Sequence, residues 1–122
     1  MPTSDHHVVK PWFNGKLDFS PPVIELKDRG FPLMGGRLDY LDRRAVAAVV
    51  YARGRHAINL FIWPDDTDGD DKAVRTKDGY NLRHWQGAGM NFWAVSDVAP
   101  VDLETFETEY KARLYADPRR AR

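Results

Sequence analysis

The stretch RLDYLDRRAVAAVVYARGRHAINLFIWP (Arg37–Pro64) decides the fold class of this 122-residue chain. At its start, apolar Leu38 and Tyr40 alternate with charged neighbours, which is strand periodicity. The next segment is almost wholly apolar and is typical of a central strand covered on both faces. Connections as short as those between the segments exclude crossover helices. The stretch therefore predicts an antiparallel meander of three strands: Arg37–Leu41, Ala45–Ala52 and Ala57–Trp63.

Two further strands and a helix are predicted after the meander. Tyr80–Trp85 and Met90–Ser96 are joined by Gln86-Gly87-Ala88-Gly89, and two glycines in so short a connection indicate a hairpin. Pro100 and Asp102 suit the first turn of a helix. The apolar residues of that helix recur at helical spacing and are expected to lie on the sheet; they are Leu103, Phe106, Tyr110 and Leu114.

The segment before the meander is expected to be irregular apart from one short helix. Val8–Phe19 mixes aromatic residues with glycine and proline, and a short strand is the alternative there. Ser20 is a suitable N-cap because proline follows it, and Gly30 would end the helix. Gly35 and Gly36 predict either a β-bulge or a close backbone approach at the start of the first strand.

The predicted fold class is α+β: an antiparallel sheet of about five strands, a β-meander plus a hairpin, with a short N-terminal helix and a C-terminal helix packed on one face. We expect one domain over residues 1–122, with residues 1–7 and 116–122 flexible. The chain is 43% hydrophobic and contains four Trp, five Tyr and six Phe, which is enough to build a core.

The composition excludes several classes of function. Lys and Arg number 18 and Asp and Glu also number 18, so no global basic field attracts nucleic acid. The chain has no cysteine and therefore no disulfide, thiolate nucleophile or cysteine-based zinc site. Its longest apolar runs, within Ala45–Ala52 and Leu60–Trp63, are far shorter than the ~20 residues that span a bilayer.

Metal-ligating residue types are present, but their spacing predicts no metal site. Counted from Asp66, an EF-hand loop would need Gly and Glu where the chain has Asp71 and Lys77. The acidic run Asp65–Asp71 is therefore expected to belong to a solvated polar loop, Asp65–Asp78, between two strands. Adjacent His6 and His7 would hold a metal only weakly without further fixed ligands. All four histidines are expected to be exposed at the edges of the domain or hydrogen-bonded; they are His6, His7, His56 and His84.

No catalytic residue or cofactor is predicted, and we expect that the protein is not an enzyme. The serines are Ser4, Ser20 and Ser96, and none lies in a G-x-S-x-G elbow. The glycine pairs form no phosphate-binding motif, and no HExxH is present.

Two groups of residues are candidates for binding a partner. Trp12 and Phe13 lie in an aromatic cluster and form either a lid on the core or a partner-binding surface. An arginine-rich set flanks the turns of the meander and forms either solvated edges or a docking patch for an acidic partner or phospholipid headgroups. That set contains Arg43, Arg44, Arg53 and Arg55. Most of the remaining aromatic residues are expected in the core: Tyr51, Phe61, Trp63, Tyr80, Trp85, Phe92 and Trp93.

The sequence resembles the C-terminal extracytoplasmic region of bacterial transmembrane anti-sigma factors. The similar stretches are VKPWFNGKLDFSPPV (Val9–Val23), GFPLMGGRLDYLD (Gly30–Asp42), AVAAVVYARGRHAINLFIWP (Ala45–Pro64), GYNLRHW (Gly79–Trp85) and NFWAVSD (Asn91–Asp97). The family usually has Asp-Gly in the first hairpin turn, where this chain has Arg43 in place of the glycine.

The resemblance implies a sensor domain on the periplasmic face of the inner membrane. A membrane helix would precede residue 1, and a cytoplasmic domain outside this chain would bind a sigma factor. An envelope protease or sensor protein would be a further partner, and self-association into a homodimer is left open. The alternative is a module of the bacterial envelope that binds a small ligand or a metal.

Overall fold

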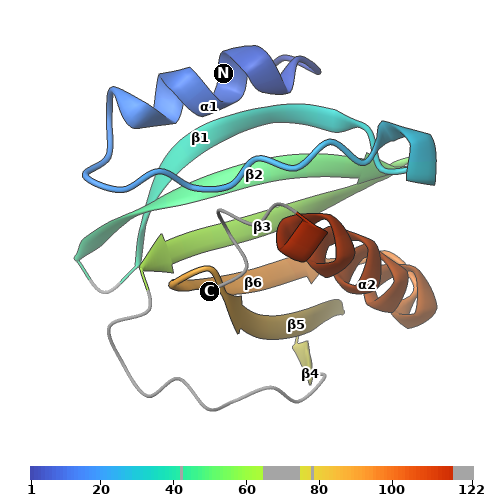
Figure 1. The fold of residues 1–122 in the computed structure, drawn as a ribbon. Coiled ribbons are helices and arrows are strands. Elements are labelled where there is room, and N and C mark those ends of the chain that lie inside the picture. The colour runs from blue at the N-terminus through green and yellow to red at the C-terminus, as the bar shows by residue number, and fades with distance from the viewer. Residues whose placement is uncertain (42, 65–74, 78, 117–122) are drawn as a thin grey trace.

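The computed structural model describes residues 1–41, 43–64, 75–77 and 79–116. They form one antiparallel sheet in the strand order β1-β2-β3-β6-β5-β4, with two α-helices (Figure 1). The strands are β1 Leu33–Leu41, β2 Arg44–Arg53, β3 His56–Pro64, β4 Arg75–Lys77, β5 Tyr80–Gly87 and β6 Met90–Ser96. The helices are α1 His6–Asn14 and α2 Pro100–Ala116, with a 3-10 turn at Lys27–Arg29.

The meander, the hairpin and the α+β class are confirmed. Residues Ala47, Ile62, Phe92 and Trp85 pair side by side across β2, β3, β6 and β5, so the alternating apolar positions form one continuous inner face. One short strand was not predicted, because β4 lies in a stretch expected to be a loop. β4 adds to the outer edge of β5 by antiparallel pairing.

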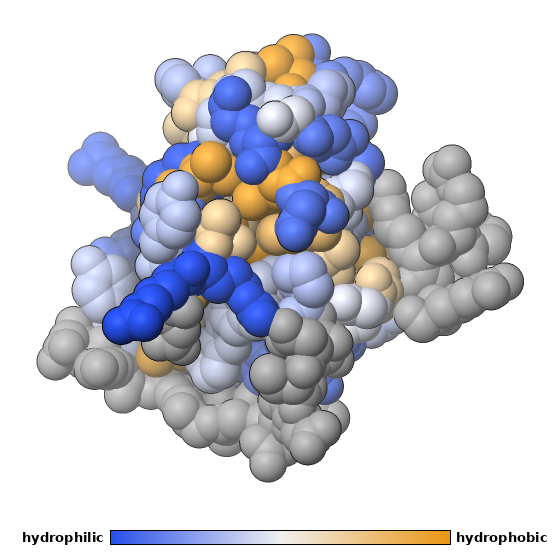
Figure 2. Space-filling view, turned by 90° about the vertical axis from the view of Figure 1, so that its left-hand side faces the viewer, coloured by the Kyte–Doolittle hydropathy of each residue, from blue (hydrophilic) through white to orange (hydrophobic). Residues whose placement is uncertain are grey.

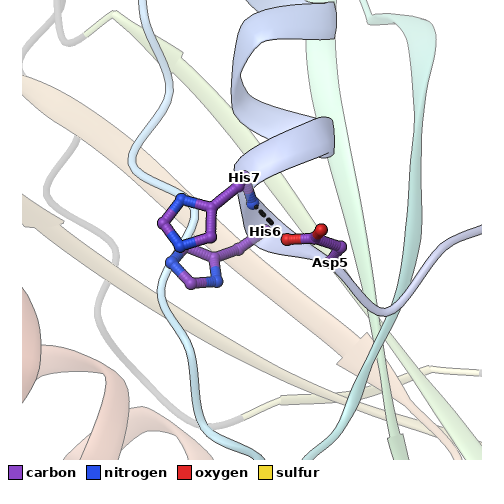
Figure 3. A group of neighbouring side chains, drawn as sticks. All are labelled: Asp5, His6 and His7. Carbon is purple, nitrogen blue, oxygen red and sulfur yellow. Dashed lines mark hydrogen bonds between the residues drawn. The ribbon is translucent and has the colours of Figure 1, made fainter.

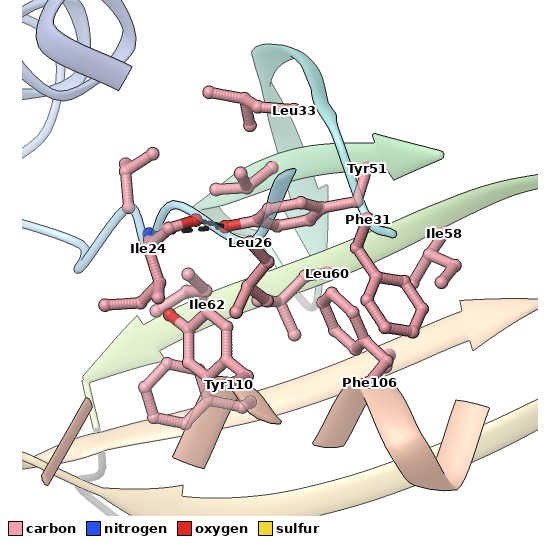
Figure 4. Close-up of a cluster of buried hydrophobic side chains, with 14 of the residues drawn as sticks. Ile24, Leu26, Phe31, Leu33, Tyr51, Ile58, Leu60, Ile62, Phe106 and Tyr110 are labelled. Carbon is pink, nitrogen blue, oxygen red and sulfur yellow. Dashed lines mark hydrogen bonds between the residues drawn. The ribbon is translucent and has the colours of Figure 1, made fainter. Parts of the chain in front are cut away.

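Helix α2 is confirmed at the predicted position, and the side chains predicted to face the sheet are buried. Phe106 packs edge-on against Phe31 and Tyr51, with ring centroids 5.3 and 5.1 Å apart (Figure 4). This aromatic cluster joins the helix to the sheet and the N-terminal segment. None of the described helices is long and apolar enough to cross a membrane.

The expectation of an irregular segment over Val8–Phe19 was wrong up to Asn14, since α1 occupies His6–Asn14, and is confirmed for residues 15–19. Asp5 is the N-cap, and its carboxylate accepts a hydrogen bond from the backbone N–H of His7 at 2.9 Å. Pro11 lies inside the helix and removes one hydrogen-bond donor. The helix forms nevertheless because Val9 and Phe13, four residues apart, are both completely buried.

The predicted helix over Ser20–Gly30 was also wrong. Pro21–Leu26 is an extended segment, here called the strap, which runs beside α2 (Figure 1). Two adjacent prolines and β-branched Val23 and Ile24 disfavour a helix there. Only the predicted role of Gly30 as a C-terminal cap is correct. It has a φ of 87° and closes the 3-10 turn.

Two buried tyrosines hold the strap in the core. The Tyr51 hydroxyl donates to the carbonyl of Ile24 at 2.6 Å and accepts from its N–H at 3.2 Å (Figure 4). The Tyr110 hydroxyl donates to the carbonyl of Pro22 at 2.6 Å. The sheet and α2 thus satisfy backbone groups that the extended strap leaves unpaired.

Both predictions for Gly35 and Gly36 are confirmed. The register of β1 and β2 shifts between Leu33 and Gly35, which is a bulge or irregularity. A Cβ at position 35 would lie 2.2 Å from the carbonyl oxygen of Met1, so the N-terminal residues approach closely. Residues 1–7, expected to be flexible, include an isolated bridge from Pro2 to Gly35 and the first turn of α1.

Candidate interaction site

The described part of the chain contains a hollow at one end of the sheet, between the segment after α1 and the β1–β2 hairpin. Its volume is about 370 Å³. Figure 2 views the molecule from the left-hand side of Figure 1 and shows hydrophobic atoms surrounded by hydrophilic residues. The lining residues are Lys16, Leu17, Asp18, Phe19, Arg44, Ala45 and Pro64.

The hollow lies where the chain bends between the end of α1 and the start of the strap. Helix α1 ends at Asn14, and the chain bends through residues 15–19 before the strap begins. Leu17 and Phe19 are partly buried and pack against the core from this bend. Asn14, Leu17, Asp18, Phe19 and Ser20 line a second hollow of about 280 Å³ beside the first.

Charged and apolar side chains together line this hollow. Lys16 and Asp18 are exposed, and Arg44 is half-buried at the start of β2. Ser20 accepts a hydrogen bond from the Lys10 ammonium group at 2.8 Å, so it is not the predicted helix cap. The lining therefore carries both signs of charge beside apolar side chains.

Trp12 and Phe13 have different environments. Phe13 is completely buried, so it acts as the predicted lid. Trp12 is half-buried, packs edge-on against Phe13 with ring centroids 5.2 Å apart, and lies 5.3 Å from the Lys16 ammonium group. The pair therefore has one core residue and one residue that is accessible from outside.

The predicted arginines form two separate groups at opposite ends of β2. Arg43 is exposed in the β1–β2 turn and Arg44 lines the hollow. Arg53 and Arg55 belong to the other end, at the β2–β3 turn. Of these four arginines, only Arg44 lines the hollow together with residues 16–19, the segment that follows α1.

Arg53 contacts three other parts of the chain. Its guanidinium is 3.0 Å from the carboxylate of Asp102, donates to the carbonyl of Arg29 at 3.2 Å, and lies 4.4 Å from the ring of Phe31. These contacts join β2 to the 3-10 turn and to the start of α2. The guanidinium is therefore occupied by three intramolecular contacts.

The four histidines do not form one cluster. His56 lies 2.9 Å from Asp97, whereas His84 is buried, contacts Asn91 at 3.1 Å and stacks on Trp93. Strand β6 separates β3 from β5, which keeps His56 and His84 apart. His6 and His7 lie together at the start of α1, and the acidic run 65–71 lies outside the described residues.

Ser96 has a structural role. Its hydroxyl donates to the carbonyl of Ala57 at 2.7 Å and accepts from the N–H of Val98 at 3.1 Å. These bonds fix the exit of β6 before α2 begins.

The expectation that most of the aromatic residues lie in the core was wrong. Tyr51, Trp85 and Phe92 are buried, but Phe61, Trp63 and Trp93 are half-buried and Tyr80 is exposed. Phe61 pairs with Trp93, and both alternate with inward-facing neighbours, so they belong to the opposite face of the sheet. The alternation of Ile58, Leu60 and Ile62 with larger aromatics was the signal that could have shown this.

No protein-family model, curated protein or solved structure matches the chain.

Proposed function

We propose that this domain is the extracytoplasmic sensor portion of a membrane-anchored anti-sigma factor and that it acts by protein contact rather than by catalysis. A membrane helix would precede Met1, and the sigma-binding domain would lie in the cytoplasm. The domain itself would lie on the periplasmic face of the inner membrane. The extent of the similar sequence stretches, from Val9 to Asp97, supports this proposal.

The observation that carries the proposal is the way the chain enters the domain. The Met1 amino group donates to the carbonyl of Gly36 at 2.7 Å, and the N–H of Gly36 donates to the carbonyl of Met1 at 2.9 Å. The N–H of Thr3 donates to the carbonyl of Met34 at 2.8 Å. In the proposed longer protein, in which the Met1 nitrogen would be a backbone amide, these hydrogen bonds would attach the entering chain to β1.

This connection supplies a physical route for a signal. Gly36 also lies against Phe13 and Val9 of α1, so a displacement of α1 would alter the hydrogen bonds that hold the chain entry. A partner that binds only one of two such arrangements shifts their populations by its difference in affinity. Loosening of the entry segment would expose backbone to an envelope protease, because cleavage requires local opening.

The surroundings of the buried hydroxyls support a non-catalytic role. The hydroxyls of Tyr51 and Tyr110 are hydrogen-bonded to backbone groups of the strap. The Ser96 hydroxyl both donates and accepts a hydrogen bond. Hydrogen bonds of this kind contribute to stability, because they satisfy buried polar groups. The hollow at Leu17–Phe19 is suited to an apolar side chain of a partner.

The test uses the full-length protein in its own cell, with a reporter gene driven by the sigma-dependent promoter. The reading frame upstream of Met1 is expected to encode an apolar segment of ~20 residues. Deleting residues 1–116 should abolish the response of the reporter to envelope stress. Arg44→Glu, in the hollow, should alter that response, whereas Arg55→Glu, at the other end of β2, should leave it unchanged.

Two results would overturn the proposal. One is an upstream reading frame without a membrane segment. The other is a reporter that responds identically with and without the domain.

A further inference from the structure

We propose that Asp5, His6 and His7 form a binding site for a divalent transition metal ion, with Glu25 as the partner that orients His6. One ligand atom from each of the first three residues lies within 4.8 Å of the other two. Figure 3 shows the two imidazole rings side by side at the start of α1. This inference stands whether or not the domain belongs to an anti-sigma factor.

The start of α1 fixes the position of these side chains. Asp5 is the N-cap, and one of its carboxylate oxygens accepts from the N–H of His7 at 2.9 Å. The backbone N–H of Asp5 donates to the hydroxyl of Thr3 at 3.2 Å. The second carboxylate oxygen of Asp5 is then available beside two rings whose centroids are 4.0 Å apart.

Glu25 contacts His6 from the strap. Its Oε2 lies 3.4 Å from Nδ1 of His6, while its Oε1 accepts from the N–H of Lys27 at 3.0 Å. At this distance a small rotation would let Glu25 accept the Nδ1 proton of His6, which would leave Nε2 to bind a metal and would set the orientation of the ring. Both carboxylates of the cluster are therefore oriented by backbone N–H groups.

The donor set indicates the class of ion. Two imidazoles and one carboxylate suit zinc and its neighbours, whereas calcium and magnesium prefer oxygen ligands alone. Bonds of about 2.0–2.2 Å in tetrahedral geometry separate ligand atoms by roughly 3.3 Å, so closing the site requires movements of roughly 1.5 Å at most. Side chains this exposed make such movements by rotation about χ1 and χ2. Water would complete the coordination.

The electrostatic balance also favours a cation here. The N-terminal end of a helix is the positive end of its dipole and disfavours a metal ion. The carboxylates of Asp5 and Glu25 offset that cost. Because Glu25 belongs to the strap, a bound ion would link α1 to the segment that Tyr51 and Tyr110 hold in the core.

The experiment is a calorimetric titration of the untagged chain with zinc chloride, followed by amide hydrogen exchange. We expect one site per chain and slower exchange in residues 6–14 when zinc is bound. His6→Asn and His7→Asn should each weaken zinc binding by about a hundredfold or more, and Glu25→Gln by about tenfold to a hundredfold. Far-UV circular dichroism should be unchanged, since these side chains are on the surface.

His56→Asn is the matched control, because it removes an exposed histidine that also contacts a carboxylate. It should leave zinc affinity unchanged. The site is refuted if zinc does not bind, if His6→Asn and His7→Asn bind as the wild type does, or if His56→Asn weakens binding equally. Unchanged affinity in Glu25→Gln would overturn the role of Glu25.

Discussion

The Cα of Gly36 faces the ring of Phe13 so closely that a methyl group at position 36 would lie 2.7 Å from its Cζ atom. The same methyl group would lie 3.1 Å from Cγ1 of Val9. Both neighbours are completely buried on the inner side of α1. The absence of a side chain at one β1 position therefore sets the distance between α1 and the sheet.

Gly36→Ala should lower the free energy of unfolding by about 1–3 kcal/mol, because the added methyl group overpacks a well-filled core. In a Phe13→Leu background the cost should be smaller, with a coupling energy of about 0.5 kcal/mol or more. Urea denaturation of the two single variants and the double variant measures this. Gly15→Ala is the control, because its Cβ would meet only backbone oxygens at 3.8 and 4.0 Å. Equal costs at Gly36 and Gly15 would contradict the packing explanation.

Arg43→Gly should raise the free energy of unfolding by about 0.5–1 kcal/mol, since a left-handed backbone is unfavourable for a residue with a Cβ. Arg43 has a φ of 66° and is exposed, so its removal loses little packing. Thermal and urea unfolding would both report the gain. Arg55→Gly should instead lower stability, because Arg55 is not among the residues with positive φ. A loss of stability in both variants would refute the backbone argument.

Tyr51→Phe should cost about 1–3 kcal/mol, because it leaves the buried N–H and C=O of Ile24 without a partner. Tyr115→Phe, which removes an exposed hydroxyl bonded to the carbonyl of Gln86 at 3.0 Å, should cost less than about 1 kcal/mol. Urea denaturation at neutral pH provides both values. Equal losses of stability in the two variants would show that the buried hydrogen bonds between Tyr51 and Ile24 contribute no more than an exposed one.

Stability should also fall at high pH through Tyr51. Burial raises the pKa of the Tyr51 hydroxyl above its ordinary value of 10.0. The unfolded chain therefore loses this proton first, and stability that is fully present below pH 10 falls as the pH rises further, by about 1.4 kcal/mol per pH unit. The difference between wild type and Tyr51→Phe isolates this effect. Parallel pH profiles for the two proteins would contradict it.

Asp28 should titrate below its ordinary pKa of 3.8, because the guanidinium of Arg113 donates to its two carboxylate oxygens at 2.8 and 2.6 Å. The stability that this pair contributes is present above the ordinary pKa and is lost as the pH falls through the lower folded value. NMR titration of the carboxyl carbon measures the shift. Arg113→Gln should return the pKa toward its ordinary value, whereas Lys111→Gln, which removes a cation paired with Glu107, should not. An unchanged pKa in Arg113→Gln would refute the assignment.

Part of the candidate site could be predicted from sequence. Arg44 and Trp12 are both candidates for partner binding from the sequence, but the structure places only Arg44 in the lining of the hollow. Leu17 and Phe19 belong to an irregular segment without periodicity, so no local signal indicates that they line a hollow. They become relevant only when the bend after α1 places them beside the start of β2.

The sequence by itself determined the meander, the hairpin and α2. Their periodicities and turns are local signals, and short connections leave few ways to pair the strands. Only the tertiary structure decided which N-terminal segment became helix. Cap preferences differ by about 1 kcal/mol, whereas burying a side chain such as Phe13 contributes about 1.5–3 kcal/mol. The space opposite Gly36 and the hydroxyls of Tyr51 and Tyr110 therefore selected a helix before residue 15 and an extended strap after residue 20.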